Sequence, residues 1–153
     1  MTSNSISNSV KDTMDIAEKL AQKAQPGDII ALSGELGTGK TAFAKGFAKG
    51  LGVKGYVSSP SFTLVQIYED GRLPLCHFDL YRLADPVTDF VDEDILEGIG
   101  FFEYLDADNI CLIEWAEYAK EYIPNSALWV EIRRDDDKDR RKIYLHSHGY
   151  IPS

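Results

Sequence analysis

The sequence predicts an α/β protein with a mixed sheet, in which a parallel core is extended by antiparallel hairpins and flanked by helices. An apolar run at Asp28–Ser33 leads through a glycine-rich loop into a helical pattern. A second continuous apolar run, Asn109–Glu114, is typical of a parallel strand buried on both faces. The turn residues Glu69–Arg72 separate two strand-like segments and indicate an antiparallel hairpin.

Length and composition favour one domain spanning residues 1–153. The chain has 153 residues, of which 44% are hydrophobic, enough for one core and too few for two. Residues 1–8 lack apolar anchors and are expected to form a flexible tail. The polar start resembles no secretory signal, and no apolar stretch reaches the length of a membrane span. We therefore expect a cytoplasmic protein with no membrane association.

The charge of the chain bears on its partners. A formal net charge of −9 argues against a chain that binds nucleic acid without a partner, since phosphate contacts need concentrated Lys and Arg. Any RNA contact should therefore run through a protein partner. The basic cluster between Arg133 and Lys142 is interrupted by four aspartates, which favours a solvated hairpin tip.

The remaining elements follow from local signals. Ser9 is typical of a helix N-cap, and the helix after it is ended by Pro26-Gly27. Phe43, Phe47 and Leu51 mark one face of a second helix, which Gly52 ends. Further strands are predicted at 62–68, 73–80, 127–134 and 141–146, short helices within 85–105, and a helix at 116–122.

The glycine-rich loop Gly34–Thr41 matches G-x-x-x-x-G-K-[ST] without a mismatch, between a strand and a helix. Glycine allows the backbone N–H groups to converge on phosphate oxygens, and the helix adds the positive end of its dipole. Lys40 supplies a charge for the terminal phosphates, and Thr41 offers a hydroxyl to Mg²⁺. The sequence therefore predicts a P-loop NTPase-like fold that binds a nucleoside triphosphate.

A P-loop also needs an acidic residue at the end of a neighbouring strand to hold the magnesium ion. Glu114 and Asp79 are the two candidates, because each closes a predicted strand. His77 shares a strand face with Asp79, and a hydrogen-bonded core histidine is the simpler interpretation of it.

The segment Ser58–Thr63 gathers four hydroxyls around Pro60. Such a loop could sense a terminal phosphate, but an ordinary turn before a strand explains it equally well. It offers no arginine to a transition state, and Arg82 is the nearest internal candidate.

The ordered set GELGTGKT, SSPSFTL, HFDLYRL, GFFEYL and IEWAE resembles the bacterial TsaE family over most of the chain. The resemblance implies that Gly37, Thr38, Gly39, Lys40 and Thr41 bind the phosphates. Thr41 and Glu114 match the magnesium positions, and Lys40, Asp79 and Glu114 match the catalytic ones. Thr13 and Arg141 match positions near the nucleotide. Two departures are Ser61 and Ala116, which stand where the family usually has threonine and proline.

The same resemblance implies a slow, magnesium-dependent ATPase with ATP and Mg²⁺ as cofactors. It would support the TsaD and TsaB proteins in forming threonylcarbamoyladenosine on tRNA, without carrying out the carbamoyl transfer itself, and would contact tRNA only indirectly. The Ser58–Thr63 loop resembles the switch of the family. Two alternatives stay open, a small-molecule P-loop kinase and a nucleotide-dependent adaptor without significant turnover.

Overall fold

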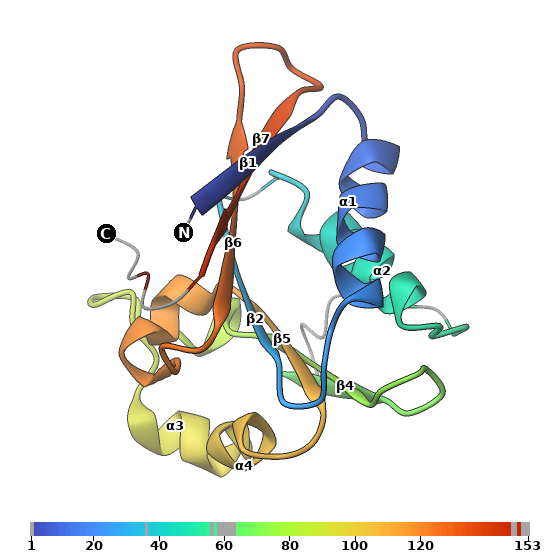
Figure 1. Cartoon of the computed structure of the whole chain (residues 1–153). Helices are drawn as coiled ribbons and strands as arrows, with labels where there is room; N and C mark the ends of the chain where they lie inside the picture. The colour runs from blue at the N-terminus through green and yellow to red at the C-terminus, as the bar shows by residue number, and fades with distance from the viewer. Residues whose placement is uncertain (1, 36, 56, 58–63, 148–149, 151–153) are drawn as a thin grey trace.

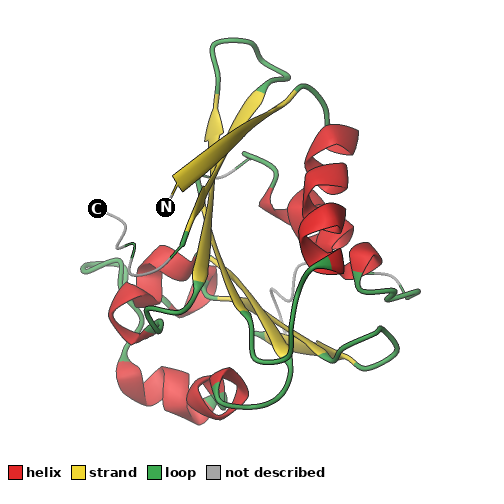
Figure 2. Cartoon of the chain, viewed as in Figure 1, coloured by secondary structure: helices red, strands yellow, loops and turns green. Residues whose placement is uncertain are grey.

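A seven-stranded mixed sheet with helices on both faces forms the described part of the chain (Figure 1, Figure 2). The computed structural model describes residues 2–35, 37–55, 57, 64–147 and 150. The strands, in the sheet order β1-β7-β6-β2-β5-β4-β3, are β1 (Thr2–Ser7), β7 (Arg141–His146), β6 (Leu128–Arg134), β2 (Ile29–Ser33), β5 (Ile110–Glu114), β4 (Leu75–Asp79) and β3 (Val65–Tyr68).

The sheet has a parallel core and antiparallel flanks, which confirms the predicted fold class. β6, β2, β5 and β4 run parallel, whereas β3 pairs with β4, and β7 with β6, as antiparallel hairpins. β4 and β5 end together, with Asp79 in register with Glu114. Both candidate acids therefore emerge at the carboxyl edge of the sheet, where open α/β sheets bind their ligands.

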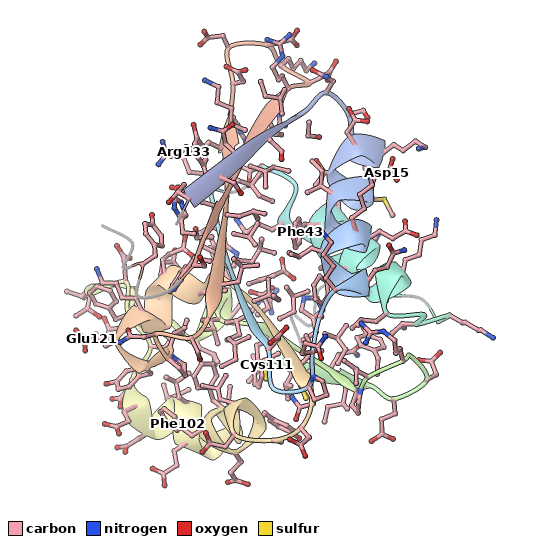
Figure 3. All side chains as sticks on the ribbon, in the orientation of Figure 1. Asp15, Phe43, Phe102, Cys111, Glu121 and Arg133 are labelled. Atoms are coloured by element: carbon pink, nitrogen blue, oxygen red, sulfur yellow. The ribbon has the colours of Figure 1, made fainter. Side chains whose placement is uncertain are left out.

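Helices α1 (Val10–Gln22) and α2 (Lys40–Gly50) cover one face of the sheet. Helices α3 (Glu93–Gly98) and α4 (Phe101–Leu105) and the 3₁₀ segments η1 (Tyr81–Leu83) and η2 (Ala116–Tyr122) lie on the other side or at its edge. Figure 3 shows Phe43 of α2 on one side of the sheet and Phe102 and Glu121 on the other. Two separate apolar clusters follow, one on each face. No helix in the described ranges is both long and apolar enough to cross a membrane.

The expected flexible tail at residues 1–8 is wrong, because Thr2–Ser7 forms β1 at the edge of the sheet. β1 pairs antiparallel with β7, from Thr2 opposite His146 to Ser7 opposite Arg141. Backbone hydrogen bonds hold such a strand without apolar side chains. The Ser7 hydroxyl is fully buried and lies 2.7 Å from the Thr13 hydroxyl, which joins the strand to α1.

The face formed by α1 and α2 depends on two glycines of α2. A Cβ atom at Gly46 would lie 2.6 Å from the Cα of Met14, and one at Gly50 would lie 2.9 Å from the Cα of Glu18. Both distances are shorter than van der Waals contact allows, so α2 can approach the backbone of α1 only where a side chain is missing. This close approach fixes the helix that follows the glycine-rich loop.

We expect Gly46→Ala to destabilise the fold by about 2–3 kcal/mol through overpacking, although alanine favours a helix by about 1 kcal/mol. Gly98→Ala is the matched control, because a Cβ atom at Gly98 in α3 would meet nothing within 4 Å. Urea unfolding of both variants measures the difference. Equal stability of the two variants would contradict the close helix contact.

Candidate functional site

The glycine-rich loop joins β2 to α2 and turns at residues with positive φ. Gly37 has φ 76° and Gly39 has φ 108°, a region that residues with a Cβ rarely adopt. Gly39 is the N-cap of α2, and no side chain there caps the helix. The first N–H groups of α2 therefore face the loop, where they can bind an anion.

The Lys40 side chain is folded into this loop rather than exposed. Only 6% of the residue is accessible, and Nζ donates to the carbonyl oxygens of Gly34 and Glu35, the latter at 2.9 Å. The ammonium also lies 3.8 Å from the ring centroid of Trp115. Burial lowers the pKa of Lys40, while the nearby carboxylates of Glu117 and Glu114 act in the opposite direction. The loop thus encloses a cation that is compensated by acids.

Asp79 and Glu114 line the same cavity as Lys40. Both residues are buried, with 8% and 3% of their surface exposed. An Asp79 Oδ1 atom accepts a hydrogen bond of 3.0 Å from the N–H of Tyr81, which fixes the carboxylate at the strand end. A cavity of about 380 Å³ is lined by Gly37, Gly39, Lys40, Thr41, Asp79, Tyr81, Glu114 and Trp115. The structure therefore brings the predicted residues Lys40, Thr41, Asp79 and Glu114 together.

His77 holds one oxygen of Glu114. Its Nε2 lies 2.6 Å from Glu114 Oε2, and both side chains are almost wholly buried. With Glu114 ionised, Nε2 carries the proton and donates it, which leaves Nδ1 without a partner among the described residues. The predicted hydrogen-bonded core histidine is confirmed, and its partner is the candidate metal ligand. His77 therefore orients that carboxylate in the way that groups behind metal ligands do.

A second cavity, of about 350 Å³, lies on the other side of the loop and is lined by the predicted residues Thr13, Gly37, Thr38, Gly39 and Arg141. Four carbonyl oxygens hold the Arg141 guanidinium: Thr38 at 3.1 Å, Gly37 at 3.4 Å, Lys138 at 2.7 Å and Arg140 at 2.9 Å. These hydrogen bonds fix the guanidinium beside the glycine-rich loop.

The predicted solvated hairpin tip is confirmed between β6 and β7, and the two strands also bring Arg134 and Arg141 close to the glycine-rich loop. Arg134 lies so close to the loop that a Cβ atom at Gly37 would be 2.6 Å from its Nη2. Arg134 and Arg141 are in register on β6 and β7, and β6 pairs with β2, which leads into the loop. Arg82, the internal candidate from sequence, is exposed within η1. The aspartates between the basic residues predicted the hairpin tip, but they could not show that β6 lies beside β2 in the sheet.

Two further residues of the site, Trp115 and Glu117, follow β5 directly. Trp115 has φ 59°, which is uncommon for a residue with a side chain, and its ring covers Lys40. Glu117 Oε2 accepts a hydrogen bond of 3.4 Å from the N–H of Gly34. Burial raises the pKa of Glu117, and the Gly34 hydrogen bond opposes this rise. The stretch IEWAE could have indicated both residues, since its last three residues follow the strand that ends at Glu114. The predicted Ser58–Thr63 switch lies outside the described residues.

A third and larger cavity, of about 510 Å³, lies between η2 and β6. Glu117 and Glu131 line it together with the aromatic side chains of Trp115, Tyr118 and Tyr150. Glu131 Oε1 already pairs with Arg133 at 3.0 Å. Glu35, Arg133 and Arg134 also line it, so its charge is mixed, whereas the cavity beside Lys40 is lined by the glycine-rich loop and the start of α2, whose N–H groups can bind phosphate.

Comparisons with known proteins agree with this architecture. Residues 7–143 match the family model of the threonylcarbamoyl adenosine biosynthesis protein TsaE. A TsaE protein of Bacillus subtilis is 43% identical over 85% of this chain and 77% of its own length, and one of Treponema pallidum is 36% identical over 88% and 94%. A crystal structure of Bacillus subtilis YdiB superposes with a TM-score of 0.81 at 36% identity, covering 97% of this chain and 87% of that one.

Proposed function

The chain belongs to the TsaE family of threonylcarbamoyl adenosine biosynthesis proteins, and from this premise we propose that it is a magnesium-dependent ATPase that supports the TsaD and TsaB proteins in modifying tRNA. One observation carries the ATPase part of the proposal. The buried carboxylates of Asp79 and Glu114 and the enclosed ammonium of Lys40 belong to residues that line a single cavity. Charges of both signs in one cavity suit a polyphosphate that arrives with a metal ion.

The loop would bind the phosphates through its backbone and two cations. The positive φ of Gly37 and Gly39 turns N–H groups of the loop inward, and α2 adds those of its first turn. Lys40 would exchange its carbonyl partners for phosphate oxygens, which are stronger acceptors. Arg134, beside Gly37, brings positive charge to the same place. The chain thus supplies internally part of the charge that the transition state of phosphoryl transfer needs.

The donor set at the strand ends fits Mg²⁺. Thr41, Glu114 and Asp79 offer only oxygen atoms, which this hard cation prefers. No group of three His, Cys, Asp or Glu residues forms a ready-made cage within the described ranges. This agrees with an ion that is held by one or two protein oxygens, phosphates and water. When bound, Mg²⁺ neutralises charge on the phosphates, while His77 keeps Glu114 directed at the cavity.

The cavity beside Thr13 and Arg141 would take the base and ribose of ATP. It adjoins the loop at Gly37–Gly39, so a nucleotide whose phosphates lie on Lys40 extends naturally into it. The Arg141 guanidinium, which belongs to the lining of this cavity, can stack on an aromatic base. This assigns Thr13 and Arg141 to the nucleoside and Thr38, Lys40 and Thr41 to the phosphates.

Partner dependence follows from charge. A chain with a net charge of −9 is poorly suited to hold tRNA by itself. A partner protein that contacts tRNA would instead have to bind this chain differently in its ATP-bound and ADP-bound forms. The TsaD and TsaB proteins are the partners that the family resemblance implies.

We expect Lys40→Met to lower ATP hydrolysis by about 100-fold or more, because the stem is kept and the cation opposite the phosphates is lost. Lys49→Met is the control, since Lys49 lies exposed in the last turn of the same helix. Phosphate release and circular dichroism of both variants measure the effect. Hydrolysis by a folded Lys40→Met variant at the wild-type rate would refute the phosphate site.

A second prediction concerns the metal. Glu114→Gln removes the charge of the side chain and keeps its shape. The Mg²⁺ concentration for half-maximal hydrolysis should therefore rise by about 10-fold or more. Asp79→Asn is the parallel variant. Glu103→Gln, on the exposed side of α4, should leave it unchanged. A magnesium titration in which neither site variant differs from this control would place the ion elsewhere.

A third prediction concerns turnover. We expect slow phosphate release by the chain alone and faster release with the purified TsaD and TsaB proteins, because a partner completes the positioning of the attacking water. Equal rates with and without them would contradict partner activation. Transfer of the γ-phosphate to an added small-molecule acceptor would favour a kinase, and ATP binding with no release in either case would favour an adaptor without turnover.

A further inference from the structure

Exposed apolar side chains gather on one segment of the surface. Seven large apolar residues are exposed in the described part of the chain, and four of them lie between residues 81 and 95. These four are Tyr81 at 45%, Val87 at 89%, Phe90 at 43% and Ile95 at 41% exposure. Isolated exposed apolar residues are ordinary, but a group within one segment is typical of an interaction site. The segment stands out from the left edge of the molecule in Figure 1.

The loop that carries Val87 and Phe90 is built by specific hydrogen bonds. The Asp85 N–H donates to Phe90 O at 2.9 Å, and the Asp89 N–H donates to Asp85 O at 2.9 Å. The Asp85 carboxylate accepts from the N–H groups of Val87 at 2.7 Å and Thr88 at 3.3 Å. Asp89 adopts φ 64°, a conformation that costs energy for a residue with a Cβ. The fold thus holds these apolar side chains in a defined position in solvent.

The charge around this loop is mainly negative. Between Leu83 and Ala119 the chain has eleven acidic residues and no Lys, Arg or His, whereas the whole chain has a net charge of −9. The rest of the chain is therefore slightly positive. Asp92, Glu93, Asp94 and Glu97, on or beside α3, are exposed next to Phe90 and Ile95. The patch therefore has an apolar centre and a mainly acidic rim, which also holds the Lys120 ammonium, 5.4 Å from the Phe90 ring centroid, and the exposed Arg82 beside Tyr81.

The same loop is joined to the phosphate site. The Val91 N–H donates to Tyr118 O at 2.9 Å. The Tyr118 ring stacks on Trp115 with centroids 5.3 Å apart, and Trp115 covers the Lys40 ammonium at 3.8 Å. Tyr81 contacts Trp115 from another side, at 4.9 Å between centroids. Four contacts thus connect the exposed loop and Tyr81 to Lys40.

We propose that Tyr81, Val87, Phe90 and Ile95 with their acidic rim form a docking surface for a protein whose contact face is an apolar recess ringed by Lys and Arg. Charge complementarity selects this occupant, since the acidic rim repels nucleic acid and anionic lipid surfaces. The proposal rests on the proposed function in one respect, that the partner which docks is the one that acts on the ATP cycle. Docking would shift the side chains of Tyr118 and Trp115 and so change the position of the Lys40 ammonium.

The test measures binding of the purified TsaD and TsaB proteins to the full chain by calorimetry. The double variant Val87→Ser with Phe90→Ser should bind about 30-fold more weakly, while its hydrolysis without partner stays at the wild-type rate. Glu93→Lys with Glu97→Lys should weaken binding and reduce its dependence on salt concentration. Ile67→Ser is the matched control, because Ile67 is 45% exposed on the edge strand β3 and should bind as wild type does.

Each outcome decides the proposal. Wild-type affinity of both double variants would overturn the docking surface and leave the proposed partnership intact. Weakening by Ile67→Ser to the same degree would also overturn it, since the effect would not be local. No binding by the wild-type chain would overturn the partnership and the docking surface together.

Discussion

The buried charges at the carboxyl edge of the sheet are the constraint on which the rest of the structure depends. Asp79 and Glu114 end neighbouring parallel strands in register, so their carboxylates lie close together with little solvent. Two adjacent buried anions are unfavourable unless cations and donors compensate them. Lys40 supplies the positive charge from the facing loop, and His77 donates to Glu114 from within the same strand layer. A magnesium ion bound with phosphates would complete this compensation.

The architecture around this edge serves to fix the glycine-rich loop against it. α2 can pack tightly on α1 because Gly46 and Gly50 lack side chains, and this places the start of α2 at the end of β2. The β6–β7 hairpin brings Arg134 and Arg141 to the same loop from the other side. The Trp115 ring covers the Lys40 ammonium and, through Tyr118, connects it to the exposed loop that carries Val87 and Phe90. The loop is therefore held by elements from both halves of the chain.

Much of this was predictable from local sequence, and what was missed depends on tertiary arrangement. The motif and the strand ends indicated Lys40, Thr41, Asp79 and Glu114, because each signal lies within a few residues of a strand. The fold class followed from apolar runs and turn residues. The pairing of Thr2–Ser7 with β7 and the contact of Arg134 with Gly37 depend on strand order, which no local pattern contains. The role of His77 became visible only once β4 and β5 were neighbours.

A crystal structure of the chain with Mg²⁺ and a non-hydrolysable ATP analogue tests the central proposal most directly. We expect the phosphates on Gly37–Thr41, the ion between Thr41 and Glu114, and the base beside Thr13 and Arg141. An analogue bound instead in the cavity between Glu117 and Tyr150, or an ion held away from both Glu114 and Asp79, would contradict the assignment of this edge as the nucleotide site.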